Sequence, residues 1–471
     1  MKKISLATAS GRALLTALLA GFGMSAQAGT GNMATGTNAG LNVTGSNNIA
    51  NGAGTGNNVS TNWNLGIGEG AGSNVSGKNA NQAIGYYAGT NVNGGWNQSI
   101  GRSAGENVTG DYNDSMGFWA GTDTKGSSNA AFGTNTGRNV TGSNNSAFGA
   151  EAGRNVTGNG NLAQGMNSGQ GVVGNANLAQ GQDAGQSVSG DNNLSAGAYA
   201  GSGTKGNANT ASGLGAGRFV VGDNNVATGV GAGIGVQGND NVSIGSNAGR
   251  GVVADNSVSI GSNSAAATHS VAMGTGATAS AASSVAMGAG ASAAAGNSVA
   301  MGAGATATAG NSVALGAGAT ATRGAQTGYA AYGMAAPQNS SGEVNVGNRQ
   351  ITGIAAGSAD SDAVNVQQLR EVTGQVANVE QGMAKLNTSI NALRGELRAG
   401  VAAAMATAAL PQSYVPGRSM VSMASGTWGG ESGYALGISH ASESGRWVVK
   451  GAANGSSRGT YGAAVGAGYQ W

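Results

Sequence analysis

The stretch Asn145-Ser-Ala-Phe-Gly-Ala-Glu-Ala-Gly-Arg-Asn-Val-Thr-Gly-Asn-Gly160 is one unit of a repeat that fills most of this 471-residue chain. The glycine that closes its Asn-Val-Thr-Gly segment recurs every 16 residues between Gly110 and Gly238. Beyond Val258 the period shortens to 14 residues, beginning with the run Ser270-Val-Ala-Met-Gly. A fixed period of this kind indicates stacked structural units and not an ordinary globular domain.

Each unit contains two short runs of alternating residues separated by Gly- and Asn-rich turns. This pattern is typical of one coil of a parallel β-solenoid, because strands alternate with a period of two and glycine permits positive φ at the corners. Asparagines can stack in ladders at such corners. About nineteen coils at a strand spacing of ~4.8 Å predict a rod on the order of 90 Å long.

One apolar position of the unit is expected to point inward in successive coils. It is occupied by Leu162, Leu178, Leu194, Val226, Val242, Val258, Val271, Val285, Val299 and Val313. Gln164 and Gln180 fall two residues later and are expected to point inward as well, where their amides would need a hydrogen-bonded ladder. A coil of this size buries little, so the roll should need neighbours along and around it.

The composition excludes several classes of protein. The chain has 91 Gly, 3 Pro and no Cys, and 8% of its residues are charged. Glycine without a three-residue period and with so little proline excludes collagen, and the lack of cysteine excludes a disulfide scaffold and thiolate sites. A formal charge of +2 gives no reason to expect a nucleic-acid partner.

The first 28 residues are expected to be an export signal. Lys2 and Lys3 precede the apolar run Ala13–Phe22, and the small-residue site Ala26-Gln27-Ala28 follows. This order is that of a Sec-type signal peptide cleaved after Ala28, and the apolar run is too short to span a bilayer as a helix. The Sec translocon is therefore an expected partner.

The C-terminal residues are expected to form four membrane-spanning strands. The amphipathic runs are Arg418–Trp428, Ser432–Ser442, Gly445–Ala453 and Gly459–Trp471. Strands of about 9–11 residues cross a bilayer when tilted, but four strands cannot close a barrel, and open edges in lipid leave backbone groups unpaired. Three copies give twelve strands, which predicts a homotrimer with a twelve-stranded transmembrane β-barrel in a Gram-negative outer membrane.

A coiled coil is expected between the repeats and these strands. Apolar residues at steps of three and four continue over four heptads, a pattern typical of a coiled-coil core. They are Leu369, Val372, Val376, Val379, Met383, Leu386, Ile390, Leu393 and Leu397, which we call the stalk seam. Their mixture does not decide between two and three helices, whereas barrel closure requires three. The small residues of Gly400–Leu410 continue the helix and suit a narrow pore.

Together these features resemble the trimeric autotransporter adhesins of the YadA-like family. Asn297-Ser-Val-Ala-Met-Gly is similar to that family's head repeat, and Asp362–Leu369 to its neck. Tyr332-Gly and Gly342–Gly347 resemble a head-to-neck connector. The 16-residue units depart from the family's 14-residue head pattern. The expected division is a signal peptide (1–28), a β-roll head (29–323), a connector and neck (324–365), a stalk (366–398) and a membrane anchor (399–471).

The resemblance implies a mainly β protein with a left-handed parallel β-roll head, a trimeric coiled-coil stalk and an anchor of helices inside twelve strands. It further implies type V secretion, dependence on the outer-membrane insertion machinery and a head exposed on the cell surface. The implied function is attachment to host cells or extracellular matrix through multivalent binding. Autoaggregation or biofilm formation through head–head association and capture of serum regulators are the alternatives.

Enzymatic chemistry finds little support in the residues, and neither a cofactor nor a metal ion is expected. The dinucleotide-like motif Gly233–Gly238 is expected by chance in so glycine-rich a chain, and no helix follows it. His269 and His440 are the only histidines and lie far apart. A β-solenoid glycan hydrolase would need paired carboxylates, but turn formation explains the aspartates that follow repeat glycines, which are Asp111, Asp191 and Asp223.

One arginine position is the candidate ligand-binding site. Arg138, Arg154, Arg218 and Arg250, which we call the arginine row, occupy the same position of their repeat units, with no acidic partner expected there. Arg138 and Arg154 should therefore lie about one strand spacing apart. The row is either a solvated edge with incidental charge or a basic stripe for sulfated glycans or acidic matrix proteins.

Overall fold

The computed structural model describes residues 29–471, which form two units divided after Arg349. Each unit is described by itself. The expected signal peptide and its cleavage site at Ala28 lie outside the described residues.

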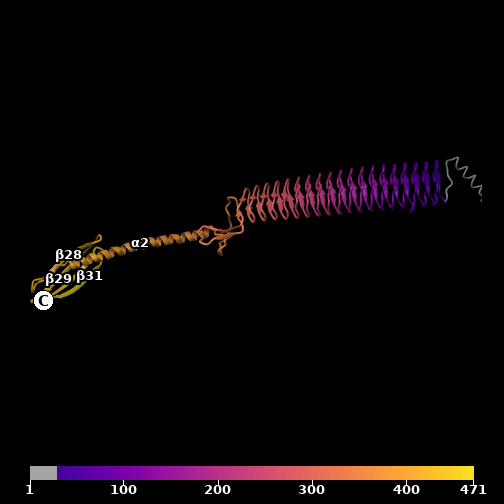
Figure 1. Ribbon diagram of the computed structural model, residues 1–471. Coiled ribbons are helices and arrows are strands. Elements are labelled where there is room, and N and C mark those ends of the chain that lie inside the picture. Colours follow the sequence, from indigo (N-terminus) through magenta and orange to yellow (C-terminus); the bar gives the residue numbers. More distant parts are fainter. Residues whose placement is uncertain (1–28) are drawn as a thin grey trace, which may run out of the picture. The chain divides into compact units, whose positions relative to one another are not determined.

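The first unit contains nineteen coils, and each coil has one three-residue strand at the same place (Figure 1). These strands are β1 (Met33–Thr35), β2 (Ile49–Asn51), β3 (Leu65–Ile67), β4 (Gln82–Ile84), β5 (Gln98–Ile100), β6 (Asp114–Met116), β7 (Ala130–Phe132), β8 (Ser146–Phe148), β9 (Leu162–Gln164), β10 (Leu178–Gln180), β11 (Leu194–Ala196), β12 (Thr210–Ser212), β13 (Val226–Thr228), β14 (Val242–Ile244), β15 (Val258–Ile260), β17 (Val271–Met273), β19 (Val285–Met287), β21 (Val299–Met301) and β23 (Val313–Leu315).

Each strand pairs in parallel with the strand of the next coil, and equivalent repeat positions face each other. Leu162 pairs with Leu178, for example, and Leu178 with Leu194. The 16-residue period continues through β15, and the 14-residue period continues in the same sheet with Val271 opposite Val285. The parallel solenoid and its coil number, both predicted from the repeat, are confirmed.

The other side of the coil differs between the two kinds of repeat. In the 16-residue coils it is held by single parallel bridges such as Thr141 with Thr157. In the 14-residue coils a second parallel sheet forms from two-residue strands. These are β16 (Ala265–Ala266), β18 (Thr278–Ala279), β20 (Ser292–Ala293), β22 (Thr306–Ala307) and β24 (Thr320–Ala321).

The predicted direction of the strand side chains is wrong. In every coil strand the middle residue is buried, as Ala163 is in β9, whereas Leu162 is only half-buried and Gln164 is exposed. The expected inward row of leucines and valines, from Leu162 to Val313, therefore lies on the outer face. Gln180 is exposed too, so the expected inward amide ladder of glutamines does not exist.

The physical reason is the thinness of the roll. Gly153 has a φ of 61° and lies across the interior from Ala147, so a Cβ added at Gly153 would come within 2.8 Å of the Ala147 Cβ. The equivalent glycine of the next coil, Gly169, has the same relation to Ala163. An interior that admits only alanine or serine opposite a glycine has no room for leucine.

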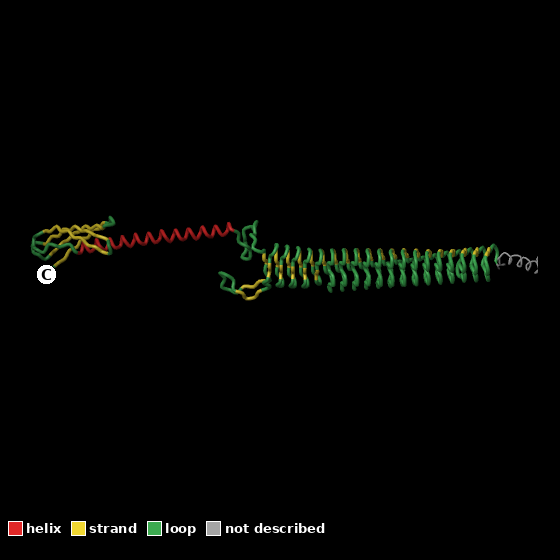
Figure 2. Tube along the Cα trace, turned by 90° about the horizontal axis from the view of Figure 1, so that it is seen from above, coloured by secondary structure: helices red, strands yellow, loops and turns green. Residues whose placement is uncertain are grey.

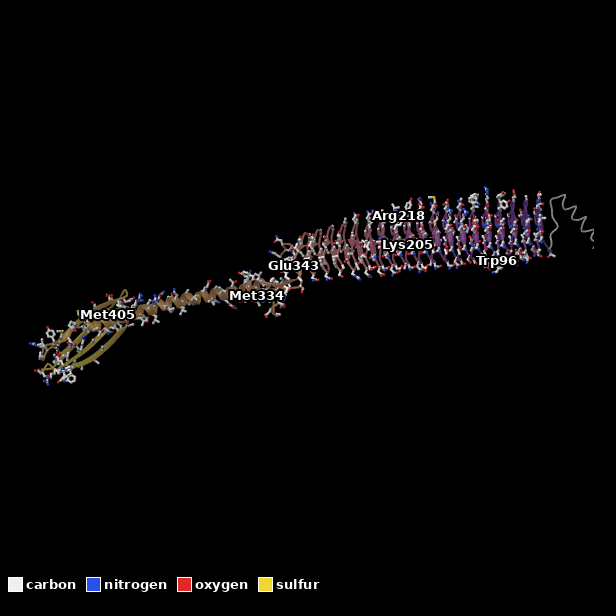
Figure 3. The ribbon with its side chains drawn as sticks, viewed as in Figure 1. Trp96, Lys205, Arg218, Met334, Glu343 and Met405 are labelled. Carbon is white, nitrogen blue, oxygen red and sulfur yellow. The ribbon has the colours of Figure 1, made fainter. Side chains whose placement is uncertain are left out.

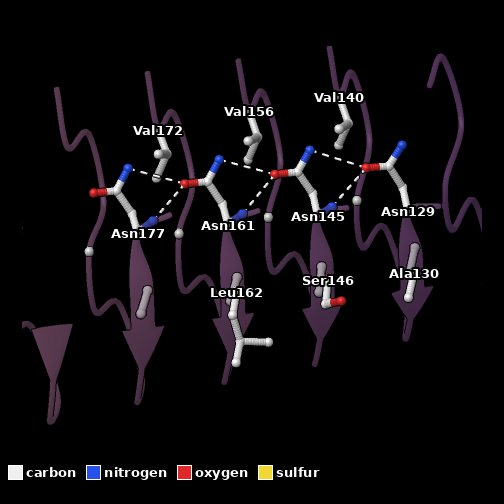
Figure 4. A pocket seen from close by; sticks show the side chains of 18 of the residues that line it. Asn129, Ala130, Val140, Asn145, Ser146, Val156, Asn161, Leu162, Val172 and Asn177 are labelled. Carbon is white, nitrogen blue, oxygen red and sulfur yellow. Dashed lines mark hydrogen bonds between the residues drawn. The ribbon is translucent and has the colours of Figure 1, made fainter. Parts of the chain in front are cut away.

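Two rows of larger side chains complete the interior (Figure 4). A column of valines, including Val140, Val156 and Val172, is buried along one side. From β2 to β14 the residue before each strand is a buried asparagine, and these asparagines bond from coil to coil, whereas a buried serine takes this place from β15 onward. The Asn161 amide nitrogen donates to Asn145 Oδ1 at 3.0 Å, and the next coil repeats the contact. Asparagine ladders, predicted from the sequence, are thus confirmed.

A short connector follows the last coil. The antiparallel strands β25 (Gln326–Tyr329) and β26 (Gln338–Ser340) form a hairpin that extends from the coils (Figure 2). Strand β27 (Val344–Asn345) then returns and pairs in parallel with β23. The guanidinium of Arg349 donates to the carbonyl oxygen of Ala317 at 2.7 Å, and so occupies backbone acceptors at the end of the solenoid.

The second unit begins with the segment before helix α2 (Val366–Ala408). Asn365 caps this helix: its side chain accepts from the Gln368 backbone N–H, and the Gln368 side chain accepts from the Asn365 N–H. Such a capping box satisfies two N–H groups that a helix start leaves unpaired. Pro411 follows three residues after the helix, where its ring cannot continue the hydrogen-bond ladder.

Four antiparallel strands end the chain in the order β28 (Ser419–Trp428), β29 (Glu431–Ala441), β30 (Trp447–Ser456) and β31 (Tyr461–Tyr469). The four predicted runs are confirmed as strands, although β30 ends at Ser456 and not at Ala453. The C-terminal part of α2 lies against this sheet through small residues, and Ala399, Ala402 and Ala406 are fully buried.

Candidate functional site and assembly surfaces

The arginine row lies along turns of the head, and the residue that follows each of its arginines is exposed. The Arg138 guanidinium carbon is 5.4 Å from the centre of the Trp119 ring, one coil earlier. Arg218 contacts two rings, those of Tyr199 at 5.9 Å and Phe219 at 5.0 Å (Figure 3). Arginines at these distances from aromatic faces are held by cation–π attraction, and the Nε atoms of Arg138 and Arg218 are buried without a hydrogen-bond partner among the described residues.

Arg154 differs from the rest of the row. Its Nη1 lies 2.8 Å from Glu151 Oε2, three residues earlier, so its charge is compensated. Alignment of the arginine position between repeat units does not reveal Glu151 as the partner of Arg154, because Glu151 stands at another position of the unit. Arg250 is exposed. The four arginines thus share an edge but not an environment: of the four, Arg154 alone forms an ion pair within the described residues.

A fifth arginine near this edge was missed by the sequence analysis. Arg102 lies between the rings of Tyr86 and Phe118, 5.5 and 5.4 Å from their centres. These three residues occupy one position in three successive coils, so the repeat alignment contained the signal. It was not recognised because only recurring arginines were considered, and here an arginine alternates with aromatic residues.

The acidic residues of the head serve its turns. Asp191 and Asp223 accept hydrogen bonds from the backbone N–H groups of Asn175 and Asn207 in the preceding coil. Asp111 accepts from Gly95 N–H in the same way. The assignment of these three aspartates to turn formation is confirmed. Within residues 29–471 no group of three or more His, Asp or Glu side chains is placed to hold a metal ion.

The stalk seam has no partner within the described part of the chain. Its nine large apolar side chains are 47–67% exposed along one helix. Burying a leucine, isoleucine or methionine side chain stabilises by about 1.5–3 kcal/mol relative to leaving it exposed. A helix with such a stripe therefore requires other helices to cover it.

The two outer strands of the anchor sheet each have one edge that pairs with no other strand of residues 29–471. β28 and β31 are its outer strands, and every residue of β31 is exposed. Gly433 of β29 allows the helix to approach, because a Cβ there would lie 2.3 Å from the Ala403 backbone nitrogen. Among the helices of the described residues, none combines the length and apolarity needed to cross a membrane.

Comparison with known proteins supports this view of the second unit. Residues 350–392 match the model of the coiled stalk of trimeric autotransporter adhesin, and residues 411–471 match that of the YadA-like membrane anchor domain. These two matches cover seven of the nine residues of the stalk seam, from Leu369 to Ile390, and all four anchor strands. The anchor places the chain in the outer membrane, with the protein exposed at the cell surface.

Curated relatives share part of the chain. Autotransporter adhesin NhhA of Neisseria meningitidis serogroup B is 42% identical over 134 residues, which are 27% of this chain and 21% of the relative. Autotransporter adhesin EhaG of Escherichia coli O157:H7 is 41% identical over 128 residues, 27% of this chain and 8% of the relative. The matched part of the chain therefore spans about a fifth or less of these relatives' length.

Among solved structures, the collagen-binding domain of the Yersinia adhesin YadA aligns with 28% sequence identity and a TM-score of 0.27, over 36% of this chain and 86% of that domain. The sequence matches in the stalk and the anchor, together with adhesin relatives from two genera, agree with the resemblance seen in the sequence. Over its stalk and its anchor, the chain is therefore similar to the YadA-like trimeric autotransporter adhesins.

Proposed function

We propose that the protein attaches the cell to host surfaces or extracellular matrix by multivalent binding of its head. The observation that carries this proposal is the in-register stacking of nineteen coils, which repeats each exposed side-chain position along one edge of the head. Binding groups that recur at about 4.8 Å suit a long ligand, because several weak contacts form at once. No catalytic step is part of this function.

We propose further that the working unit is a homotrimer. The exposed stalk seam and the unpaired outer strands β28 and β31 support this assembly. Three copies would cover the seam in a coiled coil and pair the outer strands into a twelve-stranded barrel, leaving no open edge in lipid. The half-exposed apolar side chains on the outer face of the head strands, such as Ile84, Ile100 and Met116, offer a further surface for packing between copies.

The proposed division of the chain follows the sequence expectations: head 29–323, connector and neck 324–365, stalk 366–398 and anchor 399–471. Export through the Sec translocon and insertion by the outer-membrane machinery belong to the same proposal. Continuity of α2 from Val366 to Ala408 supports the idea that the stalk helix enters the anchor without interruption.

The arginine row is our candidate for the ligand-contacting edge, with sulfated glycans or acidic matrix proteins as ligands. Arg138 and Arg218 support this assignment, since their guanidinium groups are positioned by rings and not by carboxylates. Arg102, held between two rings, extends the basic edge toward the N-terminal coils. Charge-assisted contacts of this kind should weaken as salt rises.

Display of the full chain on a non-adherent Gram-negative strain tests the function. Attachment to host cells and clumping of the bacteria should be scored separately, against a variant that lacks residues 29–323 but keeps the signal, stalk and anchor. We expect attachment by the full chain and none by the variant at equal surface level. Clumping without attachment would instead support autoaggregation, and equal attachment by both chains would remove the head from the function.

A further inference from the structure

Four consecutive coils carry Trp63, Ala80, Trp96 and Tyr112 at the same turn, and we call this group the aromatic corner. The backbone hydrogen bonds establish the correspondence. Ala80 N–H donates to Asn62 O, Trp96 N–H donates to Asn79 O, and Tyr112 N–H donates to Gly95 O, so each residue bonds to the one that precedes its counterpart in the coil before. The aromatic corner is therefore a row along the rod with alanine between two tryptophans.

The solenoid does not require aromatic residues at this turn. Trp63, Trp96 and Tyr112 have φ angles of 65°, 59° and 56°, and bulky side chains rarely adopt this left-handed conformation. In other coils the same turn is occupied by asparagines such as Asn144 and Asn192, which tolerate it well. Residues held in a costly conformation without a structural need are candidates for function.

The rings are arranged to accept another ring. Trp96 and Tyr112 are stacked, with centres 5.1 Å apart and planes inclined by 8°. One face of the Trp96 indole is covered by Tyr112, and the opposite face is directed toward the coil of Ala80, which contributes only a methyl group. Trp63 lies one coil beyond Ala80. Trp63 and Trp96 are two coils apart, at about 4.8 Å per coil. This separation leaves room for one ring that stacks on both tryptophans.

Polar groups border the same corner. The Lys78 ammonium pairs with Asp111, and its stem crosses the intervening coil so closely that a Cβ at Gly95 would lie 2.6 Å from the Lys78 Cβ. This ammonium, followed by the Gly95 N–H, holds the pKa of the Asp111 carboxyl below its ordinary value. Asn79, next to Ala80, accepts from the Asn62 N–H through Oδ1, which leaves its amide hydrogens for other acceptors.

We propose that the aromatic corner binds an uncharged glycan, with one pyranose ring inserted at the level of Ala80. A pyranose has apolar C–H faces that pack on aromatic rings and a rim of hydroxyl groups that donate and accept hydrogen bonds. The face of Trp96 and the ring of Trp63 would hold the faces of the sugar, and the side-chain amide of Asn79, next to Ala80, would meet its rim.

The inference rests on the proposed adhesive function but concerns a separate surface. Trp96 projects from the opposite edge of the head to Arg218 in Figure 3. The ligand class differs as well, because aromatic stacking and neutral hydrogen bonds do not require sulfate or carboxylate groups. Binding at the aromatic corner should consequently change little with salt, in contrast to binding at the arginine row.

Three single substitutions in the full displayed chain test the proposal. Ala80→Trp fills the level of the proposed sugar without removing any group, and its φ of 66° matches that of the neighbouring tryptophans. Trp96→Asn removes a stacking face and introduces the residue found at this turn in other coils. Ala80→Asn is the matched control, because it introduces the same common turn residue but leaves both tryptophans in place.

The probes are fluorescent uncharged oligosaccharides, chitohexaose among them, with heparin as the charged comparison. We expect the unmodified chain to bind at least one uncharged oligosaccharide, Ala80→Trp and Trp96→Asn to weaken that binding at least tenfold, and Ala80→Asn to change it less than threefold. Indole fluorescence of the detergent-extracted full chain should also shift when the sugar binds.

Two outcomes overturn the inference: absence of binding to every uncharged oligosaccharide, or equal binding by Ala80→Trp and the unmodified chain. Attachment to cells is measured on the same strains, so that the two proposals fail separately. If the unmodified chain attaches to cells but Ala80→Trp and the unmodified chain bind uncharged oligosaccharides equally, the aromatic corner is not the glycan site and adhesion stands. If the unmodified chain does not attach at all, the adhesive function itself is wrong.

Discussion

Replacement of one buried asparagine should destabilise the whole head. The Asn161 side chain makes four hydrogen bonds: its nitrogen donates to Asn145 Oδ1 at 3.0 Å and to Gly174 O at 2.8 Å, and its oxygen accepts from the backbone N–H and the amide nitrogen of Asn177 at 3.0 and 3.1 Å. In Asn161→Ala the Gly174 carbonyl and the Asn177 N–H lose these partners inside the roll.

A buried group left without a partner costs about 1–3 kcal/mol, so two such groups predict a loss of about 2–6 kcal/mol in the free energy of unfolding per chain. Because each coil is stabilised by contacts with its neighbours, the loss acts on both interfaces of the Asn161 coil. Asn159→Ala is the matched control. Asn159 is exposed and accepts from Ser143 N–H, and water can replace that contact, so we expect a change within about 1 kcal/mol.

The measurement is thermal unfolding of the detergent-extracted full chain, followed by far-ultraviolet circular dichroism, with protease resistance of the displayed protein as a second readout. Asn161→Ala should unfold at a clearly lower temperature and expose the head to cleavage near the substitution. Equal unfolding temperatures for Asn161→Ala and Asn159→Ala would refute the reasoning, since the buried ladder would then contribute no more than a surface contact.

Other parts of the chain give predictions of the same kind. Leu386→Asp should lower the amount of surface trimer far more than Asn387→Asp, because three unpaired charges in the stalk seam cost several kcal/mol; equal levels on unboiled gels would show that the seam is assigned wrongly. Changing the four residues of the arginine row to Gln should abolish salt-dependent binding of the displayed chain to heparin, and unchanged binding would reduce the row to ordinary surface charge. Gly433→Val should reduce heat-resistant trimer, because a Cβ there meets the helix at 2.3 Å, whereas Gly468→Val, with open space around its Cβ, should leave the trimer intact.

Much of the architecture could be predicted from local patterns. The 16- and 14-residue periods predict the coils and their number, because a parallel solenoid places equivalent residues side by side. The alternating runs at the C-terminus likewise predict the four anchor strands. The site was less predictable: a repeat alignment identifies Arg138 and Arg154 as neighbours, but their different partners, a tryptophan ring and Glu151, come from other positions in the coil.

The recurrence of residues along the chain is enough to specify the period, the number of coils and the position of each turn. Which strand residues face inward depends instead on packing across the coil. The alternation in Leu162-Ala163-Gln164 allows either Ala163 or its two neighbours to face the interior, and hydrophobicity alone would place Leu162 inside. The short distance across the roll favours alanine at the inward position, because the opposite residue is a glycine at which even an added Cβ would collide with it. That distance depends on how the coil closes, and it cannot be read from the sequence of one strand.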